Sequence, residues 1–354
     1  MSAASGRPKQ ARVPAGGQRG HAVPRVGAVV TSAQDRLLGS GRWKSWEYVL
    51  WLAALASPWL LASHALIINE IAIVALFALS LDLILGYTGI VSLGHAAFFG
   101  MGAYSAALFA KLVMPDPLTG LAVAVLSAAA LGAMCSATIL RGSDLTRLMV
   151  TLGVGLILME LANKLDWLTG GADGLQGVVM GPLLGRFEFN LSGRTAALYS
   201  LSVLLVLFVL ARRFVNSPFG ATLKAIRDNR LRAMAIGIPV SRHLAVVYTV
   251  AAALAGAAGA LLAQTTGFAS LDVFEFHRSA DVMLILVIGG VGWLYGGVIG
   301  AIVFKLMQDA ISSITPQYWT FWIGLFLVLL VLVGRERLIR PWSWIRRPAP
   351  RSKA

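Results

Sequence analysis

The chain has 354 residues, of which 57% are hydrophobic and only 13% charged, and its formal net charge is +14. Soluble globular domains carry about 25% charged residues, so a chain of this composition would expose a large apolar area in water. The composition therefore excludes an ordinary cytosolic enzyme or nucleic-acid-binding domain. It predicts an all-α polytopic membrane protein.

The positive charge is concentrated in three stretches, in the first 44 residues, over 212–242 and over 335–353. Basic clusters beside apolar spans are typical of cytoplasmic segments. We therefore expect 1–46 to be a disordered basic cytoplasmic tail and 335–354 to be a second basic cytoplasmic tail. Both termini are then cytoplasmic, and 47–334 forms the transmembrane domain.

Apolar runs of about 20 residues define the expected membrane crossings. In chain order they lie near 47–64, 66–86, 90–112, 119–140, 147–163, 195–211, 244–264 and 319–334. Small residues recur in the seventh run at Ala252, Gly256 and Ala260, a pattern that favours close helix packing. The sequence thus predicts about eight transmembrane helices.

The stretch 281–304 is apolar but contains six glycines, which make a single straight helix unfavourable. We expect a broken or re-entrant pair of half-helices here, outside the eight crossings. A second glycine-interrupted stretch, 86–104, contains Thr88, Ser92 and His95. Paired interrupted segments indicate a transport pathway, although glycines and serines also serve plain helix packing, and the two interpretations are equally open for Ser92 and His95.

Other ionisable residues of the apolar runs, Glu70, Asp82 and Glu160, lie near predicted helix ends, where snorkelling to the interface is cheap. We interpret them as structural. The chain has no P-loop, no HExxH motif and no GxSxG motif, and its single cysteine, Cys135, cannot form a disulfide framework. An enzyme is not expected, nor is a cofactor or metal bound by this chain.

The basic loop 212–243 has features of a docking element. Ser217 and Pro218 can cap a helix that carries Phe219, Leu223 and Ile226 on one face, and Gly237 can end a second short helix. Such a helical pair with apolar side chains and a basic rim suits a groove on a soluble partner. The alternative is a solvated connector whose charges only fix topology.

This loop, with the motif SPFGATLKAIRDNRLRAMAIGI, resembles the coupling segment of permeases of branched-chain amino acid ABC importers, specifically the M-type subunit. The stretches GYTGIVSLGHAAFFGMGAY (86–104), LTGGADGLQGV (168–178) and GGVGWLYGGVIGA (289–301) are similar to elements of the same family. The resemblance covers about 66–334. The basic N-terminal tail is not part of it.

The resemblance implies the partners and the roles of several residues. The partners would be a second homologous permease, two ATPase subunits that use ATP, and a periplasmic binding protein. The chain itself would lie in the bacterial inner membrane. No nucleic-acid partner is expected. The implied ATPase-coupling residues are Gly220, Lys224, Ala225, Ile226, Arg227, Asp228, Asn229 and Gly237. The implied substrate path contains Thr88, Ser92 and His95, and the implied binding-protein side contains Gly170, Gly171, Asp173 and Gly174.

Two alternatives stay open. A permease for urea or short amides shares the coupling loop and the GYTG-type element. A secondary transporter that does not use ATP would require ion-coupling charges well inside the bilayer, and we expect none there.

Overall fold

The computed structural model describes residues 43–140, 142–189 and 192–333. The chain divides into two units, Met1–Arg42 and Trp43–Ala354. The predicted tail 335–354 and nearly all of the tail 1–46 lie outside the described residues. The second unit is helical, with α2 (Ser45–Leu60), η1 (Ala62–His64), α3 (Ala65–Thr88), α4 (Ala96–Leu112), α5 (Pro117–Ile139), α6 (Asp144–Lys164), α7 (Asp166–Thr169), η2 (Gly171–Asp173), α8 (Arg194–Val215), α9 (Pro218–Asp228), α10 (Arg230–Ala235), α11 (Val240–Thr266), η3 (Leu271–Phe274), α12 (Phe276–Gly289), α13 (Leu294–Ile314) and α14 (Trp319–Val333).

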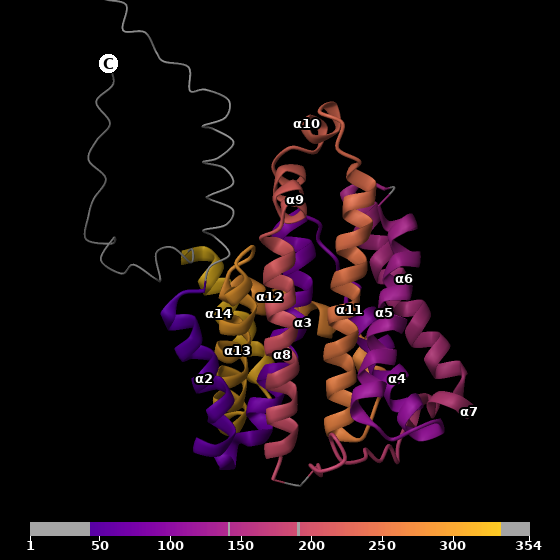
Figure 1. The fold of residues 1–354 in the computed structure, drawn as a ribbon, viewed down its shortest axis with the longest axis vertical. Coiled ribbons are helices and arrows are strands. Elements are labelled where there is room, and N and C mark those ends of the chain that lie inside the picture. Colours follow the sequence, from indigo (N-terminus) through magenta and orange to yellow (C-terminus); the bar gives the residue numbers. More distant parts are fainter. Residues whose placement is uncertain (1–42, 141, 190–191, 334–354) are drawn as a thin grey trace, which may run out of the picture. The chain divides into compact units, whose positions relative to one another are not determined.

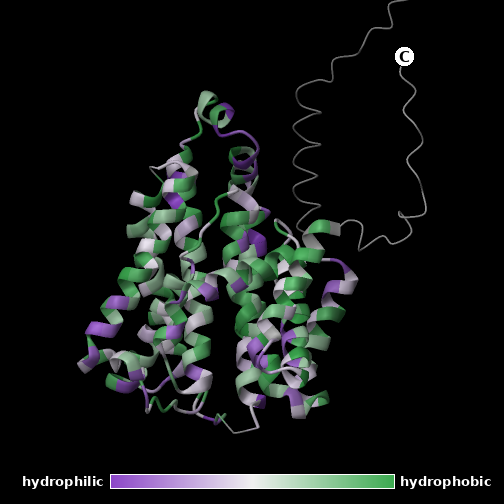
Figure 2. Ribbon diagram, turned by 180° about the vertical axis from the view of Figure 1, so that it is seen from behind, coloured by the Kyte–Doolittle hydropathy of each residue, from purple (hydrophilic) through white to green (hydrophobic). Residues whose placement is uncertain are grey.

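Six candidate membrane spans are found among the described residues by length and apolarity. They are Ala62–Thr88, Pro117–Ile139, Leu145–Lys164, Arg194–Val215, Val240–Thr266 and Leu294–Ile314. Figure 2 shows hydrophobic residues along most of the length of the helical bundle. Five of the candidate spans match expected crossings, whereas Leu294–Ile314 belongs to the stretch that was expected to lie outside the eight crossings. The remaining three expected crossings correspond to the shorter helices α2, α4 and α14. The structure thus confirms the all-helical class and the multi-pass character.

The glycine-rich stretch 281–304 is broken as predicted, because α12 ends at Gly289 and α13 begins at Leu294. The expectation of two short halves is wrong for the second half. It is 21 residues long and continues to Ile314, through Lys305, Gln308 and Asp309. The predicted stretch ended at 304, whereas α13 continues through these polar residues.

Helix α11 forms the centre of the bundle and packs against α3, α4 and α5. The predicted small-residue stripe makes this packing possible, since Ala252 and Ala260 are fully buried. Helix α3 also packs against α8 and α13. In Figure 1, α9 and α10 lie at one end of the bundle and α7 at the opposite end, and we name these the α9 end and the α7 end.

Two segments have the same arrangement in opposite orientation, in which a long helix ends at a glycine and the chain then re-enters the bundle. Helix α3 runs toward the α9 end and stops at Gly89, and non-helical residues then lead back into the bundle to α4. Helix α11 runs toward the α7 end and stops at Gly267, and residues 268–275 lead back to α12. The starts of the two shorter helices meet inside, where the Ala96 amide donates to Ser279 Oγ across 2.9 Å. The fold therefore contains an inverted pair of interrupted helices.

Candidate functional site

The turn between α12 and α13 is fixed against the end of α3. The Gly292 amide donates to Asp82 Oδ1 across 2.7 Å, and Asp82 is fully buried. A Cβ on Gly86 would lie 2.6 Å from the Gly292 nitrogen, so no other residue fits at position 86 without displacing the turn. The sequence reading placed Asp82 near a helix end as a structural residue, and the structure adds its specific role in holding the broken-helix turn.

Arg227 of α9 also contacts the end of α3 beside the turn between α12 and α13. Its Nη1 donates to the Gly86 carbonyl oxygen, and it would lie 3.1 Å from a Cβ on Gly292. One turn earlier, the Lys224 ammonium lies 5.5 Å from the centroid of the Tyr87 ring. Two basic side chains of the predicted coupling segment thus contact α3 of their own chain. This arrangement connects α9 directly to the break between α12 and α13.

The other predicted coupling residues divide by exposure. Gly220 and Ile226 are buried, whereas Ala225, Asp228, Asn229 and Gly237 are exposed. The predicted caps are confirmed, because Ser217 Oγ accepts from the Gly220 amide and Pro218 is the first residue of α9. Asn229 Oδ1 accepts from the Arg232 amide and begins α10.

The apolar face of α9 was expected to bind a partner, and the structure shows that it does not face outward. Leu223 and Ile226 are buried against the same chain, and Phe219 packs on Phe214. The exposed apolar side chains of this loop are instead on or next to α10. They are Leu231, Met234 and Ile236, which are 75%, 46% and 71% exposed.

The predicted path residues lie inside the chain. Thr88, Ser92 and His95 are all buried, and His95 is fully so. Its Nε2 shares a 2.8 Å hydrogen bond with Ser80 Oγ, and its ring stacks on Phe77 at 5.6 Å. In this conformation these side chains pack the re-entrant segment against α3 and line no open surface.

The predicted binding-protein residues lie at the α7 end. Gly170 ends α7, and Gly171 and Asp173 bound the short turn η2. Asp173 is exposed, whereas Gly171 and Gly174 are buried. The following residue, Leu175, pairs with Ala269 through two backbone hydrogen bonds of 2.8 and 3.3 Å. This loop is therefore joined to the chain that re-enters the bundle after α11.

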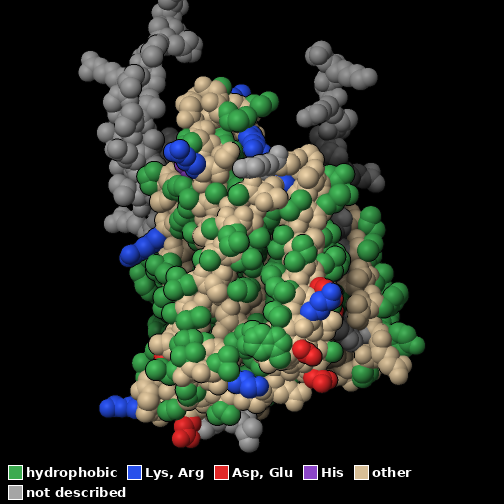
Figure 3. Space-filling model, turned by 90° about the vertical axis from the view of Figure 1, so that its right-hand side faces the viewer, with side chains coloured by type: hydrophobic (Ala, Val, Ile, Leu, Met, Phe, Trp, Pro, Cys, Tyr) green, Lys and Arg blue, Asp and Glu red, His purple; other side chains and the backbone are tan. Residues whose placement is uncertain are grey.

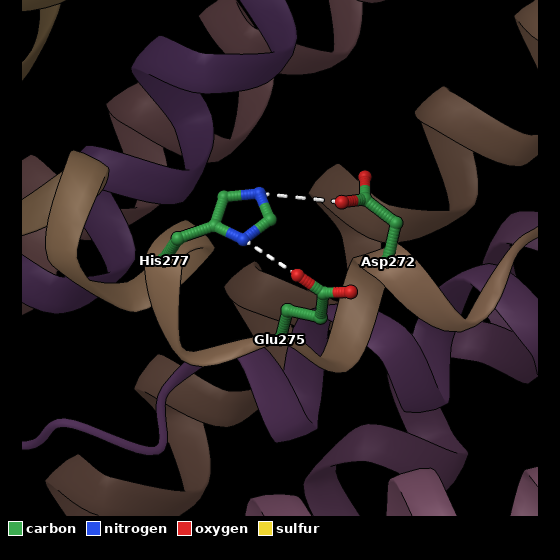
Figure 4. Close-up of side chains that lie close together, drawn as sticks. All are labelled: Asp272, Glu275 and His277. Atoms are coloured by element: carbon green, nitrogen blue, oxygen red, sulfur yellow. Dashed lines mark ion pairs between the residues drawn. The ribbon is translucent and has the colours of Figure 1, made fainter. Parts of the chain in front are cut away.

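A charged cluster that the sequence reading missed lies at the start of α12. Figure 4 shows His277 between two carboxylates, with Nε2 3.2 Å from Asp272 and Nδ1 2.7 Å from Glu275. Arg278 Nη2 donates to Asp272 Oδ2. The side chains of these residues are between 34% and 52% exposed. The run of charges directly before the glycine-rich stretch was the signal available in the sequence.

The three ligand-type residues of this cluster could in principle hold a metal ion, since their ligand atoms lie within 4.8 Å of one another. A metal would need one imidazole nitrogen as a free electron-pair donor and both carboxylates turned toward it. Here each imidazole nitrogen already faces a different carboxylate, and a guanidinium occupies Asp272. The geometry fits a compensated ion-pair cluster better than a metal centre.

The cluster lies far from either end of the bundle, near the middle of its length. Phe274, between its two acids, stacks on Tyr104 of α4 at 5.4 Å, and a Cβ on Gly100 would meet the Phe274 ring. This part of α4 packs against Gly256, near the middle of the 27-residue helix α11. Exposed charges at such depth are costly in lipid and mark pathways or partner contacts.

A cavity of about 540 Å³ lies between α5, α8 and the 183–187 loop. Its walls are almost entirely apolar, with Leu121, Val125 and Leu198 among them. It offers no charged group to bind a polar solute. Figure 3 shows that hydrophobic side chains cover most of one face of the molecule, as expected for helices in lipid.

Comparison with known proteins identifies relatives of the whole bundle. The family model "Branched-chain amino acid transport system / permease component" matches residues 63–333. The chain is 28% identical to the Escherichia coli high-affinity branched-chain amino acid transport system permease protein LivM over 82% of its own length and 73% of the relative. It is 23% identical to the E. coli permease LivH over 77% of its length and 91% of the relative. A fructose import permease of Bifidobacterium longum aligns over 39% of the chain, and no solved structure matches.

Proposed function

Because the chain belongs to the family of permease components of branched-chain amino acid transport systems, we propose that it is the M-type transmembrane subunit of an ATP-driven importer of branched-chain or related neutral amino acids. It is a multi-pass membrane permease rather than an enzyme. The proposal places it in a bacterial inner membrane, with the α9 end in the cytoplasm and the α7 end toward the periplasm.

The observation that carries the mechanism is the contact of Arg227 with Gly86, beside the hydrogen bond of Gly292 to Asp82. These contacts join α9, the end of α3 and the broken α12–α13 turn in one unit. A partner ATPase that moves α9 would therefore move the turn as well. Alternating access follows if the turn position determines which end of the pathway is open.

The exposed side chains Leu231, Met234 and Ile236 give the ATPase subunit an apolar contact at the α9 end. Lys224 and Arg227, although exposed like Ala225, Asp228 and Asn229, then contact α3 of the permease itself. A second homologous permease covers the face that carries the charged cluster of Asp272, Glu275, His277 and Arg278, since charges at this depth require a polar surrounding. The loop with Asp173 faces the binding protein.

In this arrangement Thr88, Ser92 and His95 support the pathway rather than line it in the present conformation. ATP is used by the partner subunits, and the proposal assigns no cofactor to this chain. A permease for urea or short amides is less well supported, because the relatives that span most of the chain are named for branched-chain amino acids. A secondary transporter would leave the connection between α9 and the broken turn without a purpose.

Transport by the reconstituted complex tests the proposal. Proteoliposomes containing this chain, its partner permease, both ATPases and the binding protein should accumulate labelled L-leucine or L-valine only when ATP reaches the ATPase side. Uptake that continues without ATP, or that is specific for urea instead, would contradict the proposed function.

A further inference from the structure

A second cavity, separate from the large apolar one, lies between α3, α4, α12 and α13. Its volume is about 60 Å³. Since a water molecule needs about 10–15 Å³ of such volume, the cavity has room for about four waters in this conformation. Its apolar wall is formed by Val74, Phe77, Phe99, Val282, Ile285 and Phe304.

The cavity lies halfway along two candidate spans. Val74 and Phe77 are in the middle of α3, and Phe304 is in the middle of α13. The aromatic side chains are close-packed, with the rings of Phe77 and Phe99 4.6 Å apart. A polar solute that enters this cavity has therefore reached the midplane of the bundle.

Two hydrogen-bond acceptors in the lining have no partner among the described residues. Gln308 Oε1 is buried without a hydrogen bond. Asp281 is partly buried and makes no hydrogen bond or ion pair with a described residue, although the charges of Arg278 and Lys305 act on it. A buried acceptor without a donor is unfavourable, so Gln308 Oε1 suits a ligand that supplies an N–H group, and the Asp281 carboxylate offers a second acceptor beside it.

Two cations complete the lining. Arg278 is paired with Asp272, and the Lys305 ammonium lies 2.9 Å from Glu70. Both partner acids are themselves partly exposed, with 38% and 55% of their side-chain surface accessible. The guanidinium and the ammonium each retain further donors for a carboxylate. The cavity thus presents acceptors, cationic donors and an apolar wall within one small volume.

We propose that this cavity is an intramembrane binding site for a zwitterionic α-amino acid with a small aliphatic side chain. The ligand ammonium bonds to Asp281 and Gln308, its carboxylate bonds to Arg278 or Lys305, and its side chain contacts Phe77, Phe99 and Phe304. The inference rests on the proposed function and adds a substrate site within this subunit, independent of the binding protein.

Equilibrium binding to the assembled transporter tests this site. The complex in lipid nanodiscs, without the binding protein, should bind labelled L-valine or L-leucine saturably. Asp281→Asn should weaken binding about tenfold or more, because a charge-assisted hydrogen bond is lost. Gln308→Leu, which is compatible with a membrane helix, should weaken it as well. Asp309→Asn is the matched control, since Asp309 is the next residue on α13 and is exposed.

Competition by leucine analogues, together with uptake measurements, distinguishes an amino-acid site from other kinds of site. Leucinol lacks the carboxylate and isocaproate lacks the ammonium, so each should compete far less well than leucine. Competition by Na⁺ or ammonium alone at the level of the amino acid would reveal a cation site and overturn the proposal. So would the absence of saturable binding in nanodiscs when the same complex, in proteoliposomes with the binding protein, takes up leucine with ATP, or wild-type affinity in both Asp281→Asn and Gln308→Leu. A complex that assembles but shows no ATP-driven uptake in proteoliposomes with the binding protein would instead contradict the proposed function on which the site depends.

Discussion

The backbone amide of Gly292 donates to the buried carboxylate of Asp82 across 2.7 Å, which joins residues 210 positions apart in the chain. Gly292 has a φ of +78°, and Arg227 of α9 lies beside it. The turn therefore contacts an acid of α3, Asp82, and a base of α9, Arg227. In the proposed mechanism, this arrangement couples α9 to the turn between α12 and α13.

Replacement of Gly292 by alanine should uncouple the transporter. The left-handed backbone costs about 1–2 kcal/mol for a residue with a Cβ, and that Cβ would also crowd Arg227 and the Gly86 carbonyl. We expect leucine uptake per ATP hydrolysed to fall strongly in proteoliposomes. Gly177→Ala is the matched control, because Gly177 has a φ of +73° and open space around it. Equal effects of the two variants would show that backbone strain alone matters.

Arg227 and Asp228 are neighbours with different expected effects. Arg227→Lys loses the planar guanidinium that reaches Gly86 while it keeps the charge, so uptake per ATP should fall. Asp228→Asn changes an exposed side chain and should leave coupling unchanged. Simultaneous measurement of ATP hydrolysis and uptake distinguishes the two. Strong uncoupling by the Asp228 variant alone would favour an outward, ATPase-contacting role for this stretch.

The exposed apolar side chains of the α10 region should hold the ATPase. Leu231→Ser combined with Ile236→Ser removes two anchors that are 75% and 71% exposed. We expect less ATPase to co-purify with the permease, at unchanged permease yield. Leu184→Ser provides a control at the opposite end, since Leu184 is 68% exposed there. Wild-type recovery of the ATPase with the double variant would be incompatible with this contact.

The buried ion pair of α2 with α8 should dominate local stability. Arg212 Nη1 lies 2.7 Å from Glu47, and the two side chains are only 9% and 5% exposed. Removing the carboxylate from a buried pair costs about 3–5 kcal/mol, so Glu47→Gln should lower the Tm clearly. Glu160→Gln breaks an exposed pair with Lys164 and should cost at most about 1 kcal/mol. Thermal unfolding in detergent compares them, and similar Tm values would contradict a stabilising role for the buried pair.

The sequence was sufficient for features set by local physics. The glycines of 281–304 predicted the break, Ser217 and Pro218 predicted the start of α9, and Ala252 and Ala260 predicted a close packing face. Each of these follows from backbone freedom, capping or side-chain size, and none requires knowledge of distant contacts.

Features set by distant contacts were missed. The periodicity of Leu223 and Ile226 predicted an apolar face but could not tell whether the chain itself or a partner covers it. The charges of Asp272, Glu275 and His277 were not singled out, because their depth in the bundle depends on how the chain after Gly267, which includes η3, re-enters the protein. Asp82 was interpreted by its distance from a helix end, while its role comes from a turn 210 residues away.

Co-purification from the native membrane tests the central claim most directly. The tagged chain should be isolated in mild detergent and the associated chains identified by mass spectrometry. The account predicts two P-loop ATPases and a second homologous permease in the isolated complex. Isolation of the chain alone or as a homo-oligomer that still transports solute without ATP would contradict it.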